Sequence, residues 1–253
     1  MRITICGRLR VEADGASLDE AAFPGRLGRR FWAYLVLNRR RPVGRAELVT
    51  ALWGEESPEA ADASLNAVAS RVRSALARAA ADAELRAATG SYTLSLPADV
   101  FVDRERAWTA IHHVQAIRRR GDARGAWAEA VIANEIAQRG FLPGEEAEWI
   151  EAERRVLRDI ELQSLEAICE AELDQHRPEE AERVARRLIA ADPLRESGYR
   201  LLMRALAAGG NPAQASRVMD ECRAALATVS AEPSIETERA FRQSLERRTG
   251  TPR

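Results

Sequence analysis

The sequence contains no lysine and only a few cysteines and histidines, and these shortages narrow what the chain can be. All 38 cationic residues are arginine, and this bias, with abundant alanine, indicates a GC-rich coding sequence rather than a function. The 3 cysteines lie in apolar segments without CxxC or Cys/His spacing, which favours buried thiols. His112 and His113 are adjacent and point about 100° apart on a helix, so they cannot form a metal clip. We expect no metal and no cofactor.

Long apolar runs and catalytic motifs are also missing. No run approaches the roughly 18–20 apolar residues of a membrane span, and residues 1–7 lack the apolar block of a signal peptide. We therefore expect a cytoplasmic protein without a membrane partner. The sequence holds no GxxxxGK[ST], GxSxG, HExxH or post-strand GxGxxG motif. Glu145, Glu146 and Glu148 are typical of acidic residues that open a helix, not of an acid/base pair, so we expect no enzyme.

Length and charge favour two domains and a locally clustered binding surface. The chain has 253 residues, 46% of them hydrophobic, which is enough for two packed cores. The formal net charge of −1 does not itself indicate nucleic-acid binding. Any contact with DNA must therefore come from arginines that gather locally.

The first 100 residues have the element order of a winged helix-turn-helix. Residues 2–25 alternate and predict two to four short strands. Helices and then two strands are predicted, in order, at residues 29–37, 45–53, 64–76, 85–88 and 92–96. Three helices followed by a hairpin can lay one helix in the major groove and touch the DNA backbone with the hairpin.

The third predicted helix combines an apolar stripe with a small, polar outer side. Leu65, Val68, Val72 and Leu76 recur at the spacing of a core-facing helix. The candidate DNA-binding positions outside that stripe are Asn66, Ser70, Arg71, Arg73, Ser74 and Arg78. Small residues permit close approach to base edges, and arginine or asparagine can donate to bases or phosphates. The alternative is an ordinary solvated helix face, and the hairpin that follows favours the DNA interpretation.

Two charge clusters flank the second predicted helix. Glu55, Glu56, Glu59 and Asp62 place four negative charges in a loop without a cation, so the loop must face away from DNA or contact a protein. Alternatively, Glu59 and Asp62 only complement the N-terminus of the next helix. Residues 39–41 are all arginine, and they either contact phosphates or, as we slightly prefer, stabilise a helix C-terminus.

Residues 103–248 are predicted to be almost entirely helical and contain an internal repeat. A shift of 34 residues pairs Leu165 with Tyr199, Ile168 with Leu202, Pro178 with Pro212, Ala181 with Ala215, Arg183 with Arg217, and Val184 with Val218. This period and the small residues at helix crossings are typical of tetratricopeptide repeats. We predict a mainly α fold with a small β component. Its domains are a winged helix-turn-helix over residues 1–100 and a tetratricopeptide-like helical domain over residues 101–253.

Taken together, the motifs resemble the Streptomyces antibiotic regulatory protein family of transcriptional activators. The segments that resemble its OmpR-type winged helix are residues 41–54, 64–76 and 90–92. Those that resemble its bacterial transcriptional activator domain are residues 191–196, 201–206 and 232–233. The resemblance implies an activator that binds direct repeats near a promoter, forms a homodimer on DNA and serves a biosynthetic gene cluster. It also implies recruitment of RNA polymerase, with Glu55, Glu56 and Glu59 contacting sigma or another subunit.

Position by position, the resemblance assigns roles to single residues. Asn66, Ser70, Arg71, Arg73 and Ser74 match recognition-helix positions, and Tyr92 matches a wing aromatic that reaches the DNA backbone. Ser91 replaces a usual glycine, and an arginine usual at the base of the wing is absent, with Arg86 the nearest substitute. The alternative function is a protein-interaction adaptor, built on the helical repeats, whose winged helix has lost DNA binding.

Overall fold

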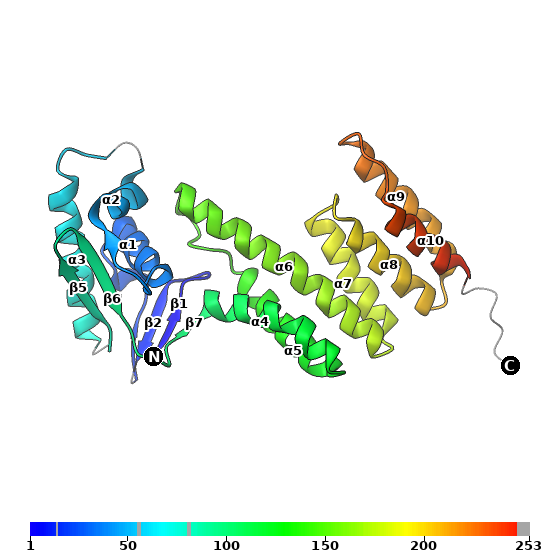
Figure 1. The fold of residues 1–253 in the computed structure, drawn as a ribbon, viewed down its shortest axis with the longest axis horizontal. Coiled ribbons are helices and arrows are strands. Elements are labelled where there is room, and N and C mark those ends of the chain that lie inside the picture. Colours follow the sequence, from blue (N-terminus) through cyan, green and yellow to red (C-terminus); the bar gives the residue numbers. More distant parts are fainter. Residues whose placement is uncertain (14, 55–56, 80–81, 247–253) are drawn as a thin grey trace. The chain divides into compact units, whose positions relative to one another are not determined.

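The computed structural model describes residues 1–13, 15–54, 57–79 and 82–246 (Figure 1). By contacts between Cα atoms, the chain divides into two compact units. The first contains Met1–Arg106 and Ile136–Leu157, and the second contains Ala107–Glu135 and the chain from Arg158 onward. This division differs from a single boundary near residue 100, because residues 136–157 group with the N-terminal unit.

Short strands and three helices form the first unit up to residue 106. In chain order they are β1 (Arg2–Thr4), β2 (Arg10–Ala13), β3 (Ala16–Leu18), η1 (Glu20–Ala22), α1 (Gly25–Leu37), β4 (Val43–Gly44), α2 (Arg45–Trp53), α3 (Ala61–Arg78), β5 (Glu84–Ala88), β6 (Ser91–Ser95) and β7 (Phe101–Val102). One sheet has the strand order β3-β2-β1-β7, with β7 parallel to β1, and the other has the order β4-β6-β5. In the hairpin, Leu85 lies opposite Leu94.

The three helices and the hairpin predicted for this region are present as α1, α2, α3, β5 and β6. The predicted start of α1 was wrong, because the helix begins at Gly25 rather than at Arg29. Pro24 is the residue that precedes the first turn, and Gly25 takes a φ of 60° that glycine adopts without strain. The Pro-Gly pair therefore starts the helix instead of only separating it from the strands.

The predicted apolar stripe of α3 is confirmed as core. Leu65, Val68, Val72 and Leu76 are each at most 2% exposed. Helix α1 packs against both α2 and α3, and its Phe31 is fully buried. Because one side of α3 is held in this core, its opposite side is turned outward on a fixed support.

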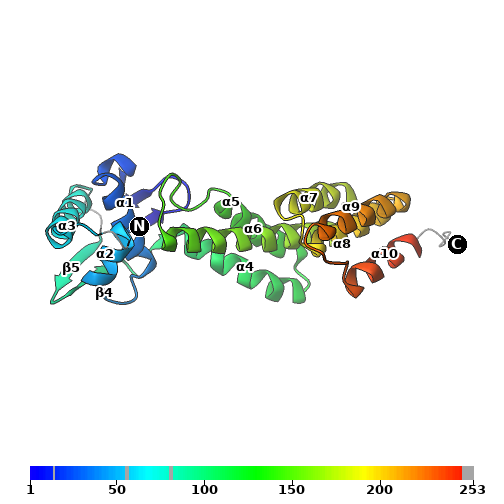
Figure 2. The same ribbon diagram turned by 90° about the horizontal axis from the view of Figure 1, so that it is seen from above.

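Helices make up the second unit, and the first three of those given below have residues in both units. They are α4 (Asp103–Arg119), α5 (Ala123–Ala137), α6 (Glu148–Asp174), α7 (Pro178–Ala191), α8 (Glu196–Ala208), α9 (Ala215–Ala227) and α10 (Ile235–Glu246), with a short 3-10 turn η2 (Pro212–Gln214) before α9. Figure 2 shows α7, α8 and α9 side by side, in agreement with their packing. None of the helices in the described ranges is both long and apolar enough to cross a membrane.

Some residues paired by the 34-residue repeat occupy equivalent environments, although Val184 is half-buried and its counterpart Val218 is buried. Ala181 and Ala215 are both 0% exposed, where α7 and α9 meet their neighbouring helices. The arginines at positions 183 and 217 are both exposed. The match is incomplete at the prolines, because Pro178 is the first residue of α7 whereas Pro212 begins the turn η2.

Candidate nucleic-acid interface

The outer side of α3 carries the predicted contact residues. Each of them is exposed, and none belongs to the buried stripe. They are Asn66, Ser70, Arg71, Arg73, Ser74 and Arg78. Their common exposure comes from the helical period, since the positions between them are the ones that face the core.

Two arginines on this side donate to backbone carbonyls. The Arg71 side chain donates from Nε to the carbonyl of Ala67 on the same helix, at 3.3 Å. Arg73 donates from Nε to the carbonyl of Leu85 on β5, at 3.1 Å. A guanidinium has five N–H donors, so each side chain keeps several for another partner.

Asn66 is fixed from the side by two residues that lie far from it in sequence. Its Oδ1 accepts from Nη1 of Arg45 at 2.9 Å and from the hydroxyl of Tyr92 at 3.0 Å. Arg45 in turn donates to the Asp62 carboxylate, with a shortest distance of 2.8 Å. This network joins the start of α2, the start of α3 and β6. We define these four residues as the Asn66 network.

The structure buries Tyr92, which differs from the expected wing aromatic that reaches the DNA backbone. Tyr92 is 2% exposed, and its ring packs edge to face on Phe31, with 5.6 Å between ring centroids. On β6 its backbone pairs with Val43 of β4. The ring thus belongs to the core between the hairpin and α1, and its hydroxyl serves Asn66.

The hairpin itself presents one predicted arginine to solvent. Arg86 on β5 is exposed and forms an ion pair with Glu84 at 2.5 Å. The hydrogen bond from Arg86 lowers the pKa of Glu84. Gly90, with a φ of 74°, makes the turn between the strands, and its carbonyl accepts from the backbone N–H of Arg45.

The acidic loop is only partly described. Glu55 and Glu56 lie outside the described residues, and Glu59 is exposed. Asp62 forms an ion pair with Arg45, which lies outside the loop at the start of α2. Asp62 also lies in the first turn of α3, where a negative charge stabilises the helix N-terminus.

The arginines at positions 39–41 follow α1, whose last residue is Leu37, so they lie just beyond its C-terminus. The last turn of α1 contains no basic residue. Arg39 donates to Glu105 at 2.7 Å. Arg41 pairs with Glu47, which also accepts from the Tyr34 hydroxyl at 2.7 Å. Opposite charges explain their positions without a phosphate.

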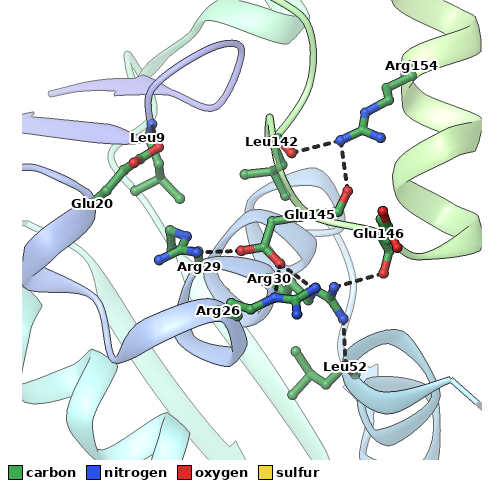
Figure 3. Close-up of polar contacts among 10 residues, drawn as sticks. All are labelled: Leu9, Glu20, Arg26, Arg29, Arg30, Leu52, Leu142, Glu145, Glu146 and Arg154. Atoms are coloured by element: carbon green, nitrogen blue, oxygen red, sulfur yellow. Dashed lines mark hydrogen bonds and ion pairs between the residues drawn. The ribbon is translucent and has the colours of Figure 1, made fainter.

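Glu145 does not open α6, as the sequence predicted, but lies buried three residues before it. Figure 3 shows this carboxylate among three guanidiniums from the start of α1. It accepts from Arg26 at 3.1 Å, from Arg29 at 2.5 Å and from Arg30 at 2.8 Å. Burial alone would raise the pKa of Glu145, but these hydrogen bonds outweigh it and lower the pKa. We call these four residues the Glu145 cluster.

Further contacts attach the same segment to α1 and α2. Arg30 also donates to the carbonyls of Leu52 and Glu146, at 3.1 and 2.8 Å (Figure 3). The Trp149 indole donates to the carbonyl of Ala51 at 2.9 Å. Sequence reasoning missed this attachment, because partners about 100 residues apart leave no periodic signal.

Cysteine and histidine provide no evidence of a metal or redox site. All three cysteines are free and buried, and burial is the main cause that raises the pKa of each thiol, to about 12 for Cys169 and about 11 for Cys222. Within the described ranges, no three potential ligands gather as a metal site would require. His112 donates locally from Nδ1 to the carbonyl of Trp108, at 2.8 Å.

In sequence and in fold, the chain is similar to transcriptional regulators. Residues 98–245 match the model of the bacterial transcriptional activator domain, and the chain belongs to this family. The match spans more than half of the chain. Together with the relatives below, it confirms the resemblance to Streptomyces antibiotic regulatory proteins.

Two curated relatives carry regulatory names. The chain is 32% identical over 227 residues to the regulatory protein AfsR of Streptomyces coelicolor. This match covers 90% of this chain and 22% of AfsR. It is 39% identical over 95 residues to the transcriptional regulatory protein EmbR of Mycobacterium tuberculosis, covering 37% of this chain and 24% of EmbR. The chain therefore spans less than a quarter of AfsR.

A solved structure has the same fold. Mycobacterium tuberculosis EmbR, determined in complex with a low affinity phosphopeptide, matches 99% of this chain and 66% of its own, with a TM-score of 0.84. The sequence identity is 23%, so this match concerns the fold alone. It agrees with the predicted mainly helical fold with few strands.

Proposed function

We propose that this chain is a sequence-specific, DNA-binding transcriptional activator and that the outer side of α3 enters the major groove. In this proposal residues 1–100 form a winged helix-turn-helix and residues 101–253 a tetratricopeptide-like domain. The observation that carries it is the exposure of Asn66 and the arginines of α3 on a helix whose other side is core. A helix supported in this way can reach base edges, and in this proposal the hairpin of β5 and β6 serves as the wing.

Small residues at the centre of this surface support groove entry. Ser70 and Ser74 are exposed and lie between longer polar side chains on the same helix. A helix needs such small positions to approach base edges closely, while flanking arginines reach guanine or phosphate. By contrast, an adaptor function would not require small residues on this side of α3.

The proposal is tested by selecting duplexes from a random double-stranded library. The affinity for the selected duplexes is then measured by gel shifts at several salt concentrations. We expect enriched duplexes whose affinity falls steeply with salt, because cationic contacts release counterions. Arg71→Ala should weaken binding by about 1–3 kcal/mol if Arg71 reads a base, since its only hydrogen bond seen among the described residues is to its own helix.

The matched control is Arg10→Ala, which removes one exposed arginine from β2 in the other sheet. We expect this variant to bind like the unmodified chain. If no duplex is enriched, the adaptor function is favoured. If the Arg10 and Arg71 variants bind equally well, Arg71 does not contact DNA.

We also propose that the loop between α2 and α3 contacts RNA polymerase and that the chain binds direct repeats as a homodimer. Glu59 is exposed on this loop, and the charges of Glu55 and Glu56 would repel phosphate. Reversing the charges of Glu55 and Glu56 should leave gel shifts intact and lower transcription from a promoter that carries the selected duplex. Equal loss of binding and transcription would contradict a polymerase contact.

A further inference from the structure

We infer that Asn66 presents only its amide N–H groups to DNA, so that it contacts guanine or phosphate and does not read adenine. This inference rests on the proposed DNA-binding function and adds the base chemistry of one position. Asparagine otherwise reads adenine through two bonds, accepting from N6–H and donating to N7. The Asn66 network removes the accepting half of that pair.

The orientation of the Asn66 amide follows from its partners. Arg45 is 2.9 Å from Oδ1, and a guanidinium can only donate, so the atom that faces it must be oxygen rather than nitrogen. The Tyr92 hydroxyl donates its one proton to the same oxygen at 3.0 Å and accepts from Arg45 at 3.1 Å. Each donor and acceptor in this triangle therefore has a consistent role.

The two donors use the accepting capacity of Asn66. An amide oxygen has two lone pairs, and Arg45 and Tyr92 occupy both. Both donors are themselves held, Arg45 by the Asp62 carboxylate and its carbonyl, and Tyr92 by the ring of Phe31. Releasing Oδ1 for adenine would leave a guanidinium and a largely buried hydroxyl without this acceptor, which costs free energy.

The amide nitrogen of Asn66 keeps two protons on an exposed residue. In the major groove, two acceptors side by side are N7 and O6 of guanine, whereas adenine offers one acceptor beside a donor. The oxygens of a phosphate are also acceptors. A side chain that only donates therefore fits guanine or the backbone and has no partner for the N6–H of adenine.

The test compares duplex selection by the unmodified chain with selection by Asn66→Ala, followed by measured affinities for duplexes that differ at one base. We expect one of two results for the Asn66 variant. Either it loses a guanine preference, with a loss of about 5- to 150-fold for the guanine duplex, or it loses affinity equally for all duplexes. The first result identifies a base contact and the second a phosphate contact, and both agree with donation alone.

Tyr92→Phe tests the role of the network separately. It keeps the ring on Phe31 and frees one lone pair of Asn66, so for a base contact the affinity for adenine relative to guanine should rise. A merely structural role would lower affinity for all duplexes and leave that ratio unchanged. The matched control is Tyr34→Phe, which removes a hydroxyl bonded to Glu47 and not to Asn66, and should leave the ratio unchanged.

Two results overturn the inference while DNA binding stands. One is a preference for adenine that disappears in Asn66→Ala. The same preference must also disappear when the adenine is replaced by purine, which lacks the N6 amino group. The other is unchanged binding by Asn66→Ala, which would mean that Asn66 does not contact DNA. If no duplex is enriched by the unmodified chain, the proposed function fails, and this inference fails with it.

Discussion

Replacing Glu145 by glutamine should loosen the attachment of residues 142–154 to α1. The carboxylate is 1% exposed, and the side chains of Arg30, Arg29 and Arg26 are 10%, 26% and 61% exposed. Breaking a buried ion pair costs about 3–5 kcal/mol, whereas an exposed pair contributes about 0–1 kcal/mol. The contact with Arg30 therefore dominates.

The cost falls to the lower limit of that range or slightly below it, for two structural reasons. Arg30 keeps two carbonyl acceptors, those of Leu52 and Glu146. Glutamine also keeps one oxygen for a guanidinium, although its amide nitrogen now faces donors. We expect a loss of about 2–3 kcal/mol in the local opening free energy, which corresponds to about 30- to 150-fold faster exchange of protected amides.

Hydrogen exchange followed by mass spectrometry measures this loss in peptides that cover residues 142–154. The matched control is Glu146→Gln, because Glu146 is exposed and contributes its backbone carbonyl, not its carboxylate, to Arg30. We expect that variant to exchange like the unmodified chain. Protection in Glu145→Gln within about twofold of the unmodified chain, or equal loss in both variants, would refute the reasoning.

The pH dependence of the same exchange gives an independent check of the charge. Because the folded-state pKa of Glu145 lies below its ordinary value of 4.5, its contribution is present above that pH and is lost as the pH falls through the lowered pKa. After correction for intrinsic exchange rates, protection of the unmodified chain should fall in this acid range. The Glu145→Gln variant should lack that component, since it has no carboxylate to protonate.

The remaining predictions concern thiols, packing and a second ion pair. All three cysteines should stay unreactive toward a disulfide reagent until the chain is unfolded, because their thiols are buried and their pKa values raised. Ala215→Leu should lower the free energy of unfolding of the second unit by about 1–3 kcal/mol in urea titrations, since this position is 0% exposed. The control is Ala213→Leu at an exposed position, and a smaller loss for Ala215→Leu than for this control would contradict the packing. Glu47 should titrate at about 2 in carbon NMR, and Arg41→Ala should raise that pKa toward 4.5; no change would exclude Arg41 as its main cause.

Local sequence signals were sufficient for most of the fold. Helix α3 could be placed because its apolar residues recur at the helical period and its core face is continuous, and every stripe position is buried. The tetratricopeptide-like arrangement stays a prediction, although Ala181 and Ala215, which the 34-residue shift pairs, are both 0% exposed. The two-residue strands β4 and β7 were missed, since a pattern of alternation needs more positions than they have.

The candidate site was less predictable, because exposure follows from periodicity but hydrogen-bond partners do not. The outer positions of α3 could be named from the helical period. Nothing local links Arg45 to Asn66 or to Tyr92, which lie 21 and 47 residues away and meet only once the hairpin folds beside α3. Tyr92 shows how local pattern and family resemblance can disagree. It alternates with Leu94 on β6, and this alternation is typical of buried side chains, whereas the family resemblance predicted a contact with the DNA backbone.

A nearly neutral chain can still present a cationic surface when its acids are committed elsewhere. Residue type does not separate Arg30 from Arg71, yet Glu145 holds the first in the core, whereas the second bonds only its own helix among the described contacts. Such a buried acid neutralises arginines that stabilise the fold, as Glu145 does for Arg30. It follows that the net charge of −1 bears little on DNA binding. What matters is the charge on the outer side of α3, where Arg71 and Arg73 bond backbone carbonyls and, among the described residues, no acid.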